Sequence, residues 1–161
     1  MANEYITVGI SDMKMTRQQG IIATYALGSC IGICLYDPVI KLGSMIHIML
    51  PSASDNYAGN TFKFADTGIA ETLRKMEVFG ARRTRLVAKI AGGAKMFNVL
   101  GDSDFGNIGG RNIDMVRSIL GKEKIPIRNQ DVGGTVARTL LLNVENGDAV
   151  VKIFGQNEKI L

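Results

Sequence analysis

The side chains best suited to chemistry near neutral pH lie within residues 24–50. This stretch holds both cysteines of the chain, Cys30 and Cys34, and its single histidine, His47. A thiol and an imidazole are the groups that most readily serve as nucleophile and base at that pH. Cys30 and His47 stand 17 positions apart, on two apolar runs separated by the turn signal Asp37-Pro38. We therefore predict two neighbouring antiparallel strands that bring Cys30 and His47 together as a nucleophile pair.

The residues around Cys30 suggest two further roles. Gly28-Ser29 forms a tight corner directly before Cys30, which would push the thiol out of the sheet. Backbone N–H groups at such a corner can receive an oxyanion, so Gly28 and Ser29 are candidates for an oxyanion or substrate loop. Thr24, six residues before Cys30, is a candidate to orient the imidazole of His47.

Each of these residues also has an ordinary structural interpretation. Free cysteine is a common core residue, and a single histidine in an apolar strand is more often a hydrogen-bonded core side chain. Thr24 alone is equally a β-branched strand residue. Cys34 lies inside the apolar run Ile-Cys-Leu-Tyr, and we assign it to packing.

The cysteine count limits the metal and redox chemistry of the chain. On one strand, positions 30 and 34 would lie about 13 Å apart at roughly 3.3 Å per residue, too far for a disulfide. With two cysteines and one histidine, the chain cannot build a four-ligand zinc site from soft ligands within one copy. We expect no metal and no cofactor.

The composition predicts one globular domain spanning residues 1–161. The hydrophobic fraction is 46% and the charged fraction 21%, which is a globular balance. We find no apolar run long enough for a membrane span and expect no export signal, so we predict a cytoplasmic protein. The net charge of +4 favours an acidic macromolecular partner only weakly. Without basic residues interleaved with aromatics, nucleic-acid binding is not expected, and the Arg82-Arg83-Thr84-Arg85 cluster is interpreted as a solvated loop.

Hydrophobic periodicity predicts an α+β fold. Residues 64–79 and a segment from Asn112 to Gly121 have the spacing of amphipathic helices. Residues 11–20 are interpreted as polar and turn-like, residues 94–99 as one helical turn, and residues 101–110 as a glycine-rich loop. Strands are predicted at 4–10, 21–27, 31–36, 42–50, 85–91, 125–129, 138–144 and 149–154. Asn146-Gly147 is a strong hairpin signal, so the last two strands are predicted to pair. The order favours a mixed, largely antiparallel sheet with two main helices packed on it.

Three glycine pairs punctuate the second half of the chain: Gly92-Gly93, Gly109-Gly110 and Gly133-Gly134. None belongs to a phosphate-binding pattern of the G-x-x-x-x-G-K-[ST] or G-x-G-x-x-G type. We interpret them as tight loops at which backbones pass closely.

Several motifs together resemble one family. Thr24-x3-Gly28-Ser29-Cys30, Asp37-Pro38 and His47-x2-Leu50-Pro51 are similar, in this order, to the signature of the chemoreceptor glutamine deamidases, the CheD family. The resemblance continues through the rest of the chain, to about Gly155, in Phe64-Ala65-Asp66, Lys89-Ile90-Ala91-Gly92-Gly93-Ala94-x-Met96-Phe97, Ile108-Gly109-x-Arg111-Asn112 and Asp131-x-Gly133-Gly134-x3-Arg138.

The resemblance implies a function and a site. Members of the family hydrolyse the side-chain amides of glutamines on the helical cytoplasmic part of chemoreceptors, and some remove methyl esters from receptor glutamates. The family's catalytic cysteine, histidine and threonine fall on Cys30, His47 and Thr24. The implied fold is an α/β sandwich like that of certain deamidating toxins, and the implied partner is a CheC-type phosphatase.

Two positions depart from the family pattern, and one other function stays open. Ala26 stands where a glycine is common, and Thr135 stands where an asparagine is common after Gly133-Gly134. The alternative to an enzyme is a non-catalytic binding module that regulates a phosphatase such as CheC.

Overall fold

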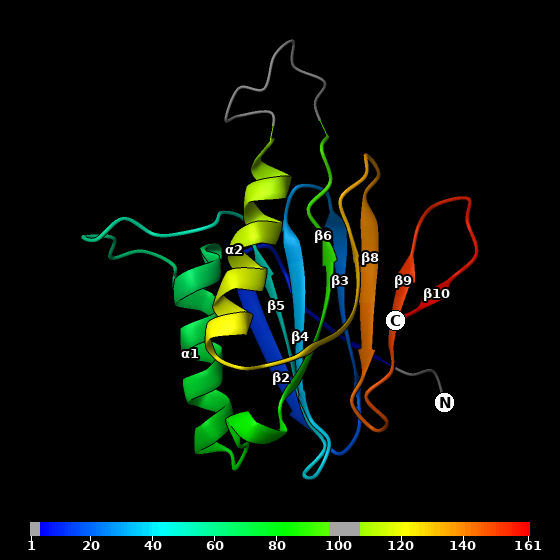
Figure 1. The fold of residues 1–161 in the computed structure, drawn as a ribbon. Helices are drawn as coiled ribbons and strands as arrows, with labels where there is room; N and C mark the ends of the chain where they lie inside the picture. The colour runs from blue at the N-terminus through cyan, green and yellow to red at the C-terminus, as the bar shows by residue number, and fades with distance from the viewer. Residues whose placement is uncertain (1–3, 97–106) are drawn as a thin grey trace.

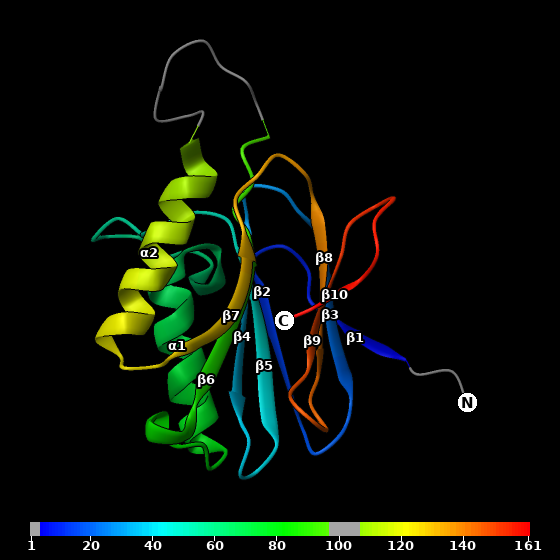
Figure 2. The same cartoon turned by 45° about the vertical axis from the view of Figure 1, so that its right-hand side comes forward.

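Three layers stack in the computed structural model, which describes residues 4–96 and 107–161 (Figures 1 and 2). The helices α1 (Ala65–Val78) and α2 (Ile108–Lys122) form the first layer. A five-stranded sheet, here called the central sheet, forms the second, and another five-stranded sheet, the outer sheet, forms the third. The helices cover one face of the central sheet, and the outer sheet covers its other face (Figure 2).

The central sheet has the strand order β2-β5-β4-β6-β7. Its strands are β2 (Asp12–Arg17), β4 (Ile31–Asp37), β5 (Leu42–Ile48), β6 (Val87–Gly92) and β7 (Ile127–Val132). Every residue of β4 and β5 is buried. A strand packed on both faces needs apolar side chains on both, which explains why these two segments read as continuous apolar runs.

The outer sheet has the order β1-β3-β8-β9-β10. Its strands are β1 (Tyr5–Thr7), β3 (Ile21–Leu27), β8 (Arg138–Asn143), β9 (Ala149–Lys152) and β10 (Lys159–Ile160). Asn146-Gly147 lies in the turn that joins the antiparallel pair β8 and β9, as predicted. Two short 3₁₀ helices, Thr61–Lys63 and Arg83–Arg85, flank α1 in the sequence.

Each helix buries one apolar stripe against the central sheet. On α1 the buried side chains include Ile69, Leu73 and Met76, and on α2 they include Val116 and Leu120. These positions are spaced by three or four residues, so they lie on one helix face. Together with the side chains of β4, β5 and β6 that face them, they form one hydrophobic cluster.

The predicted α+β class, with largely antiparallel pairing and two main helices, is confirmed. Pairing is antiparallel everywhere in the two sheets except between β1 and β3 and between β6 and β7. The structure adds that the strands divide into two sheets. Alternation of apolar residues reports which side of a strand is buried, but it does not report which sheet the strand joins.

Some predicted boundaries are wrong. Residues 11–20 are not a turn, because β2 occupies their middle as an edge strand; Met13 and Met15 pack onto the core while the other side chains reach solvent. The second helix begins at Ile108, before the predicted Asn112, and runs past Gly121 to Lys122. Residues 97–99 of the predicted helical turn and 101–106 of the predicted loop lie outside the described residues; residues 94–96 are not helical, and residues 108–110 belong to α2.

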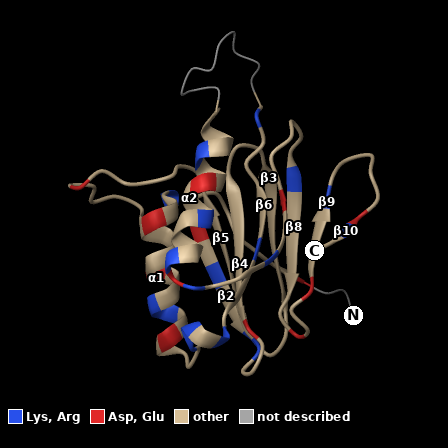
Figure 3. Ribbon diagram, viewed as in Figure 1, with Lys and Arg blue, Asp and Glu red and all other residues tan. Residues whose placement is uncertain are grey.

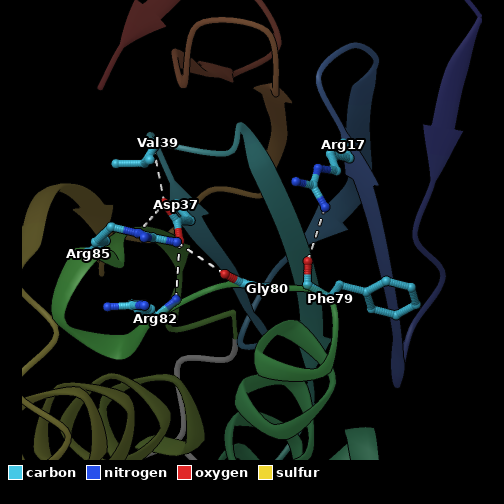
Figure 4. A network of polar contacts seen from close by, with 7 residues as sticks. All are labelled: Arg17, Asp37, Val39, Phe79, Gly80, Arg82 and Arg85. Atoms are coloured by element: carbon cyan, nitrogen blue, oxygen red, sulfur yellow. Dashed lines mark hydrogen bonds and ion pairs between the residues drawn. The ribbon is translucent and has the colours of Figure 1, made fainter.

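A buried carboxylate anchors the end of β4 farthest from Cys30 (Figure 4). Asp37 is fully buried and accepts hydrogen bonds from the guanidinium of Arg85 at 2.8–3.1 Å and from the N–H groups of Val39 and Arg82. Burial alone would raise the pKa of Asp37, but these bonds outweigh it and lower the pKa. Arg83 pairs with Glu77 and Glu123, so the arginine cluster is largely neutralised within the fold.

A search of the described residues for a helix long and apolar enough to cross a membrane finds none.

Candidate active site

The strands that carry Cys30 and His47 are neighbours, as predicted. β4 and β5 pair antiparallel, with Gly32 opposite His47 and Ile31 opposite Ile48. Cys30 precedes β4 and is in phase with Gly32, so it lies diagonally across from His47 on the face that meets the outer sheet. Gly32 has no side chain between them; a Cβ there would lie 2.8 Å from Leu140 and 3.5 Å from Thr24.

Thr24 and His47 meet in the layer between the two sheets. Thr24 comes from β3 of the outer sheet, and its Oγ1 lies 2.7 Å from Nδ1 of His47. The same hydroxyl donates its proton to the carbonyl oxygen of Val8 at 2.8 Å. A hydroxyl has one proton, so the oxygen of Thr24 must accept a hydrogen bond from Nδ1–H. His47 is therefore the Nδ1–H tautomer, and its Nε2 carries a lone pair.

The imidazole is neutral and its second nitrogen is unengaged. His47 is 1% exposed and Thr24 is fully buried. Burial lowers the pKa of His47 to about 4, because the charged ring would lose its hydration. Among the described residues, Nε2 of His47 is buried without a hydrogen-bond partner. An unpaired buried lone pair costs stability and is a proton acceptor awaiting a donor.

Cys30 is the accessible thiol and Cys34 the inaccessible one. Both are free; Cys30 is half-buried, whereas Cys34 is 1% exposed in the cluster between the sheets. Burial raises the pKa of Cys30, an effect that the thiol's hydrogen bond with its own backbone N–H partly opposes. Burial raises the pKa of Cys34 to about 12. The assignment of Cys34 to packing is confirmed.

The resting pair is a neutral thiol beside a neutral imidazole, and not the preformed thiolate that a Cys–His pair often holds. In this structure Nε2 of His47 has no bond to the Cys30 sulfur. Directly diagonal positions of an antiparallel pair lie about 7–8 Å apart between Cα atoms, with the side chains nearer. Side chains at this spacing are near enough to meet, and catalytic groups often make such a contact only with substrate present.

The three carbonyl groups of the corner at Cys30 all accept hydrogen bonds from residues that follow β6 or lie on α2. The oxygens of Gly28 and Cys30 accept N–H bonds from Ala94 and Gly93, each at 2.8 Å. The oxygen of Ser29 accepts a bond of 2.9 Å from the side-chain amide of Asn112 on α2. Three consecutive carbonyls are thus turned toward β6 and α2.

The N–H groups of the corner are less engaged. Gly28 N–H donates to Ala26 at 3.0 Å, so it is used within the corner itself. For the N–H groups of Ser29 and Cys30, no backbone acceptor occurs within residues 4–96 and 107–161. Of the two predicted oxyanion candidates, Ser29 therefore has an N–H group without a backbone acceptor in the described part of the chain, and the N–H of Cys30 contacts the thiol of its own residue.

Backbone conformation near the site explains why glycine is common in the family pattern at the position of Ala26. Ala26 has φ of +56°, in the left-handed region that favours glycine, and the β3–β8 register shifts between Thr24 and Leu27. The glycine at this position in the family pattern would take that conformation without strain.

Two of the glycine pairs act as predicted, at close backbone approaches. A Cβ on Gly92 would lie 2.2 Å from the oxygen of Cys30, and one on Gly109 would lie 2.4 Å from the oxygen of Gly93. These contacts seat β6 and the start of α2 against the Cys30 corner.

Charges of both signs are mixed over the helical layer. Lys and Arg are interspersed with Asp and Glu over both helices (Figure 3). Exposed pairs such as Arg74–Glu71 illustrate the mixture. No single-sign face covers the helical layer in this view, whereas binding to a phosphate backbone uses a basic patch or stripe.

The fold and the site together define a class. An α+β domain presents a thiol at a strand corner, with a neutral histidine on the next strand and a hydroxyl that fixes the tautomer of that histidine. This set of groups is the one that thiol-dependent amidases and esterases use.

The chain belongs to the CheD family. A family model described as "CheD chemotactic sensory transduction" matches residues 49–153. Cys30, His47 and Thr24 precede that span, and the similarity to whole proteins extends over nearly the full chain. A "Probable chemoreceptor glutamine deamidase CheD" of Syntrophomonas wolfei is 49% identical over 99% of each chain. Proteins with the same name from Caldanaerobacter subterraneus and Symbiobacterium thermophilum are 43% and 39% identical, over 100% of each chain and over 94% and 93% of the two chains, respectively.

Two residues of the site region were not singled out from the sequence. Gly32 was counted only as a strand residue, although the missing side chain opposite His47 makes room for the pair. Asn112 was interpreted as the start of a helix and as part of a motif shared with the family, and no role in the site was assigned to it. A detectable signal existed, because Asn112 lies on the same apolar stripe as Val116 and Leu120, and a polar residue on a buried stripe requires a partner.

Proposed function

We propose that this protein hydrolyses the side-chain amides of glutamines on chemoreceptors, through a thioester on Cys30. The observation that carries the proposal is the bond between Thr24 and His47, which leaves Nε2 as a proton acceptor on the strand next to Cys30. The substrate class comes from the relatives, which are named chemoreceptor glutamine deamidases and are up to 49% identical to this chain.

The first half-reaction forms the thioester. The Cys30 sulfur attacks the carbonyl carbon of the glutamine side chain while its proton passes to Nε2 of His47. The carbonyl oxygen becomes an oxyanion, which the N–H groups of Ser29 and Cys30 receive. When the tetrahedral intermediate collapses, the carbon–nitrogen bond breaks, and ammonia departs with the proton from Nε2.

The second half-reaction hydrolyses the thioester. Nε2 of His47, unprotonated again, removes a proton from water as the water oxygen attacks the thioester carbon. Collapse of this second tetrahedral intermediate breaks the carbon–sulfur bond, and the proton returns to the Cys30 sulfur. The products are a glutamate side chain and free thiol. A glutamate methyl ester would react by the same steps with methanol as the leaving group.

Thr24 acts on the ring and not on the substrate. Its oxygen accepts from Nδ1–H, which holds the tautomer in which Nε2 is basic, and stabilises the charge on the ring after proton uptake.

A partner and a location accompany the proposed activity. A substrate on the cytoplasmic helical part of chemoreceptors requires a cytoplasmic protein. We also propose a CheC-type phosphatase as a binding partner, as the family resemblance implies. Co-purification of the protein with such a phosphatase from the same cells tests this partner independently of the chemistry.

The decisive test uses mass spectrometry of a purified chemoreceptor cytoplasmic domain. The wild-type protein is expected to give the mass increase of amide-to-acid conversion at discrete glutamines. Cys30→Ala should abolish that conversion, and Cys34→Ala, a matched change of the other thiol, should retain it. Conversion by Cys30→Ala would refute the thioester mechanism. A Cys34→Ala variant that folds normally but does not deamidate the receptor would show that the nucleophile had been assigned to the wrong cysteine.

Thiol alkylation separates an enzyme from a binding module. In an enzyme, iodoacetamide should modify Cys30 selectively, and His47→Gln should slow that modification because the proton acceptor is gone. Cys34, buried and with its pKa raised to about 12, should stay unmodified in the folded protein. A Cys30 thiol that reacts no faster in the wild type than in His47→Gln would favour the regulatory module.

A further inference from the structure

The side chain of Asn112 joins the two segments that carry the reacting groups. Asn112 is fully buried in the first half of α2. Its Nδ2 donates to the carbonyl oxygens of Ser29 and Met49, both at 2.9 Å. The amide nitrogen of asparagine has two protons, so both are used. One bond reaches the corner before Cys30, and the other reaches the chain just after β5, which carries His47.

The bond to Ser29 fixes a peptide group of the proposed oxyanion site. The oxygen of Ser29 and the N–H of Cys30 belong to the same peptide plane, in which they point in opposite directions. Turning that carbonyl toward α2 therefore turns the Cys30 N–H away from α2. This N–H also lies near the Cys30 sulfur, because its hydrogen bond acts to lower the pKa of that thiol.

Three hydrogen bonds hold the carbonyl groups of the Cys30 corner, and the one from Asn112 comes from a side chain. The carbonyls on either side, Gly28 and Cys30, are held by backbone N–H groups of Ala94 and Gly93. Only the middle carbonyl depends on a side chain, so only there can a substitution release one peptide without redirecting β6.

The amide of Asn112 is oriented by its donors. The opposite orientation would place Oδ1 against two carbonyl oxygens, which repel it. In the part of the chain that the structure describes, Oδ1 is buried without a partner. The fold therefore tolerates an unsatisfied acceptor in order to keep the two donors in place.

We propose that Asn112 is a positioning residue of the reaction. It holds the Ser29–Cys30 peptide so that the Cys30 N–H faces the developing oxyanion, and it ties that peptide to the segment following His47. This inference rests on the proposed thioester mechanism. A merely structural role would be to satisfy two buried carbonyls, with no effect on turnover by the folded protein.

The test compares two variants of Asn112 with a matched control. Asn112→Asp has nearly the same shape but, when ionised, donates no hydrogen bond. Asn112→Ala removes both donors and leaves space that water can enter. The control is Thr72→Val, which removes a buried hydroxyl that donates to the carbonyl of Gly68 within α1, away from the corner. All are assayed at a temperature at which circular dichroism shows them folded.

Loss of a positioned oxyanion donor is expected to lower kcat for receptor deamidation by about 100-fold in both Asn112 variants. KM should change little, because Asn112 lies behind the corner, and Thr72→Val should keep the kcat of the wild type. At lower pH the kcat of Asn112→Asp, but not that of Asn112→Ala, should move closer to the wild-type kcat, because a protonated carboxyl regains one O–H donor.

Two results would overturn the inference. One is a wild-type kcat in folded Asn112→Ala and Asn112→Asp. The other is a loss that appears entirely in KM. Either would leave the proposed function intact, because that function is judged by the wild type against Cys30→Ala in the same assay.

Discussion

The Oγ1 atom of Thr24 lies 2.7 Å from Nδ1 of His47 while donating its only proton to Val8. Through this contact, a strand of the outer sheet fixes the tautomer of a histidine ring on the central sheet. The contact requires the two sheets to keep their spacing, because it crosses the interface between them. The chemistry proposed for Nε2 therefore depends on sheet packing as well as on the side chains themselves.

Thr24→Val should separate the hydroxyl from the shape of the side chain. Valine fills nearly the same volume but cannot accept from Nδ1–H, so the ring loses the bond that selects its tautomer. We expect kcat for deamidation to fall by about 100-fold. Thr24→Ser keeps the oxygen and should retain most of the activity. If the valine variant turns over like the wild type, the ring is oriented by packing alone.

The single histidine makes the pH dependence of stability readable. The pKa of His47 falls from 6.5 in the unfolded chain to about 4 in the folded protein. Below pH 6.5 the unfolded state binds a proton that the folded state does not, so stability is fully present above pH 6.5 and is lost as pH falls toward 4. Between pH 7 and 5 the loss should be about 2 kcal/mol.

Urea unfolding at several pH values measures this dependence. Carboxylates titrate mainly below pH 5 in the unfolded chain, so the upper part of the window belongs to His47. His47→Gln should remove the slope between pH 7 and 5. A wild-type slope that survives in His47→Gln would show that another group is responsible.

Asp37 should matter for stability and not for turnover. Asp37→Ala leaves the Arg85 guanidinium and two N–H groups without their acceptor, and we expect a loss of about 3 kcal/mol. For a chain of this size that loss corresponds to a fall in Tm of roughly 10 °C. Asp37 and Cys30 lie at opposite ends of β4, about 20 Å apart at the usual rise per residue, so kcat of the folded variant should stay unchanged.

Thermal unfolding with an activity assay below the transition tests this separation. Arg74→Ala, which breaks an exposed ion pair with Glu71, is the control and should leave Tm nearly unchanged. A folded Asp37→Ala of low kcat would mean that strain at this end of β4 reaches the site.

The local pattern of the sequence predicts most of the fold, and the failures have physical causes. β4 and β5 were found because strands buried on both faces are continuously apolar. β2 was missed because an edge strand tolerates Lys14 and Arg17, and only Met13 and Met15 mark its buried side. The early start of α2 was missed because Gly109-Gly110 resembles a loop.

The site was predicted in its residue types but not in its electrostatics. A thiol and an imidazole on neighbouring strands follow from spacing and a turn signal. The tautomer, the neutral resting pair and the clamp by Asn112 depend on contacts between residues as far as 83 positions apart. Such contacts are set by how the three layers stack, and a periodicity along the chain does not encode them.

Two glycines of α2 provide a last test of how this helix supports the corner. A Cβ on Gly109 would lie 2.4 Å from the oxygen of Gly93, whose N–H holds the carbonyl of Cys30. Gly109→Ala must therefore displace the start of α2 and with it Asn112. We expect a loss of about 1–3 kcal/mol from overpacking, together with a lower kcat.

Gly121→Ala makes the same change near the other end of α2, where a Cβ would meet nothing within 4 Å. It should stabilise the protein by about 0.5–1 kcal/mol, because alanine favours the helix over glycine, and it should keep kcat. Urea unfolding and deamidation rates measure both effects. A loss of stability and of kcat in Gly109→Ala, beside a gain of stability and an unchanged kcat in Gly121→Ala, would show that the start of α2 supports the Cys30 corner. Full activity in a destabilised Gly109→Ala would show that the corner keeps its geometry without close contact to the helix.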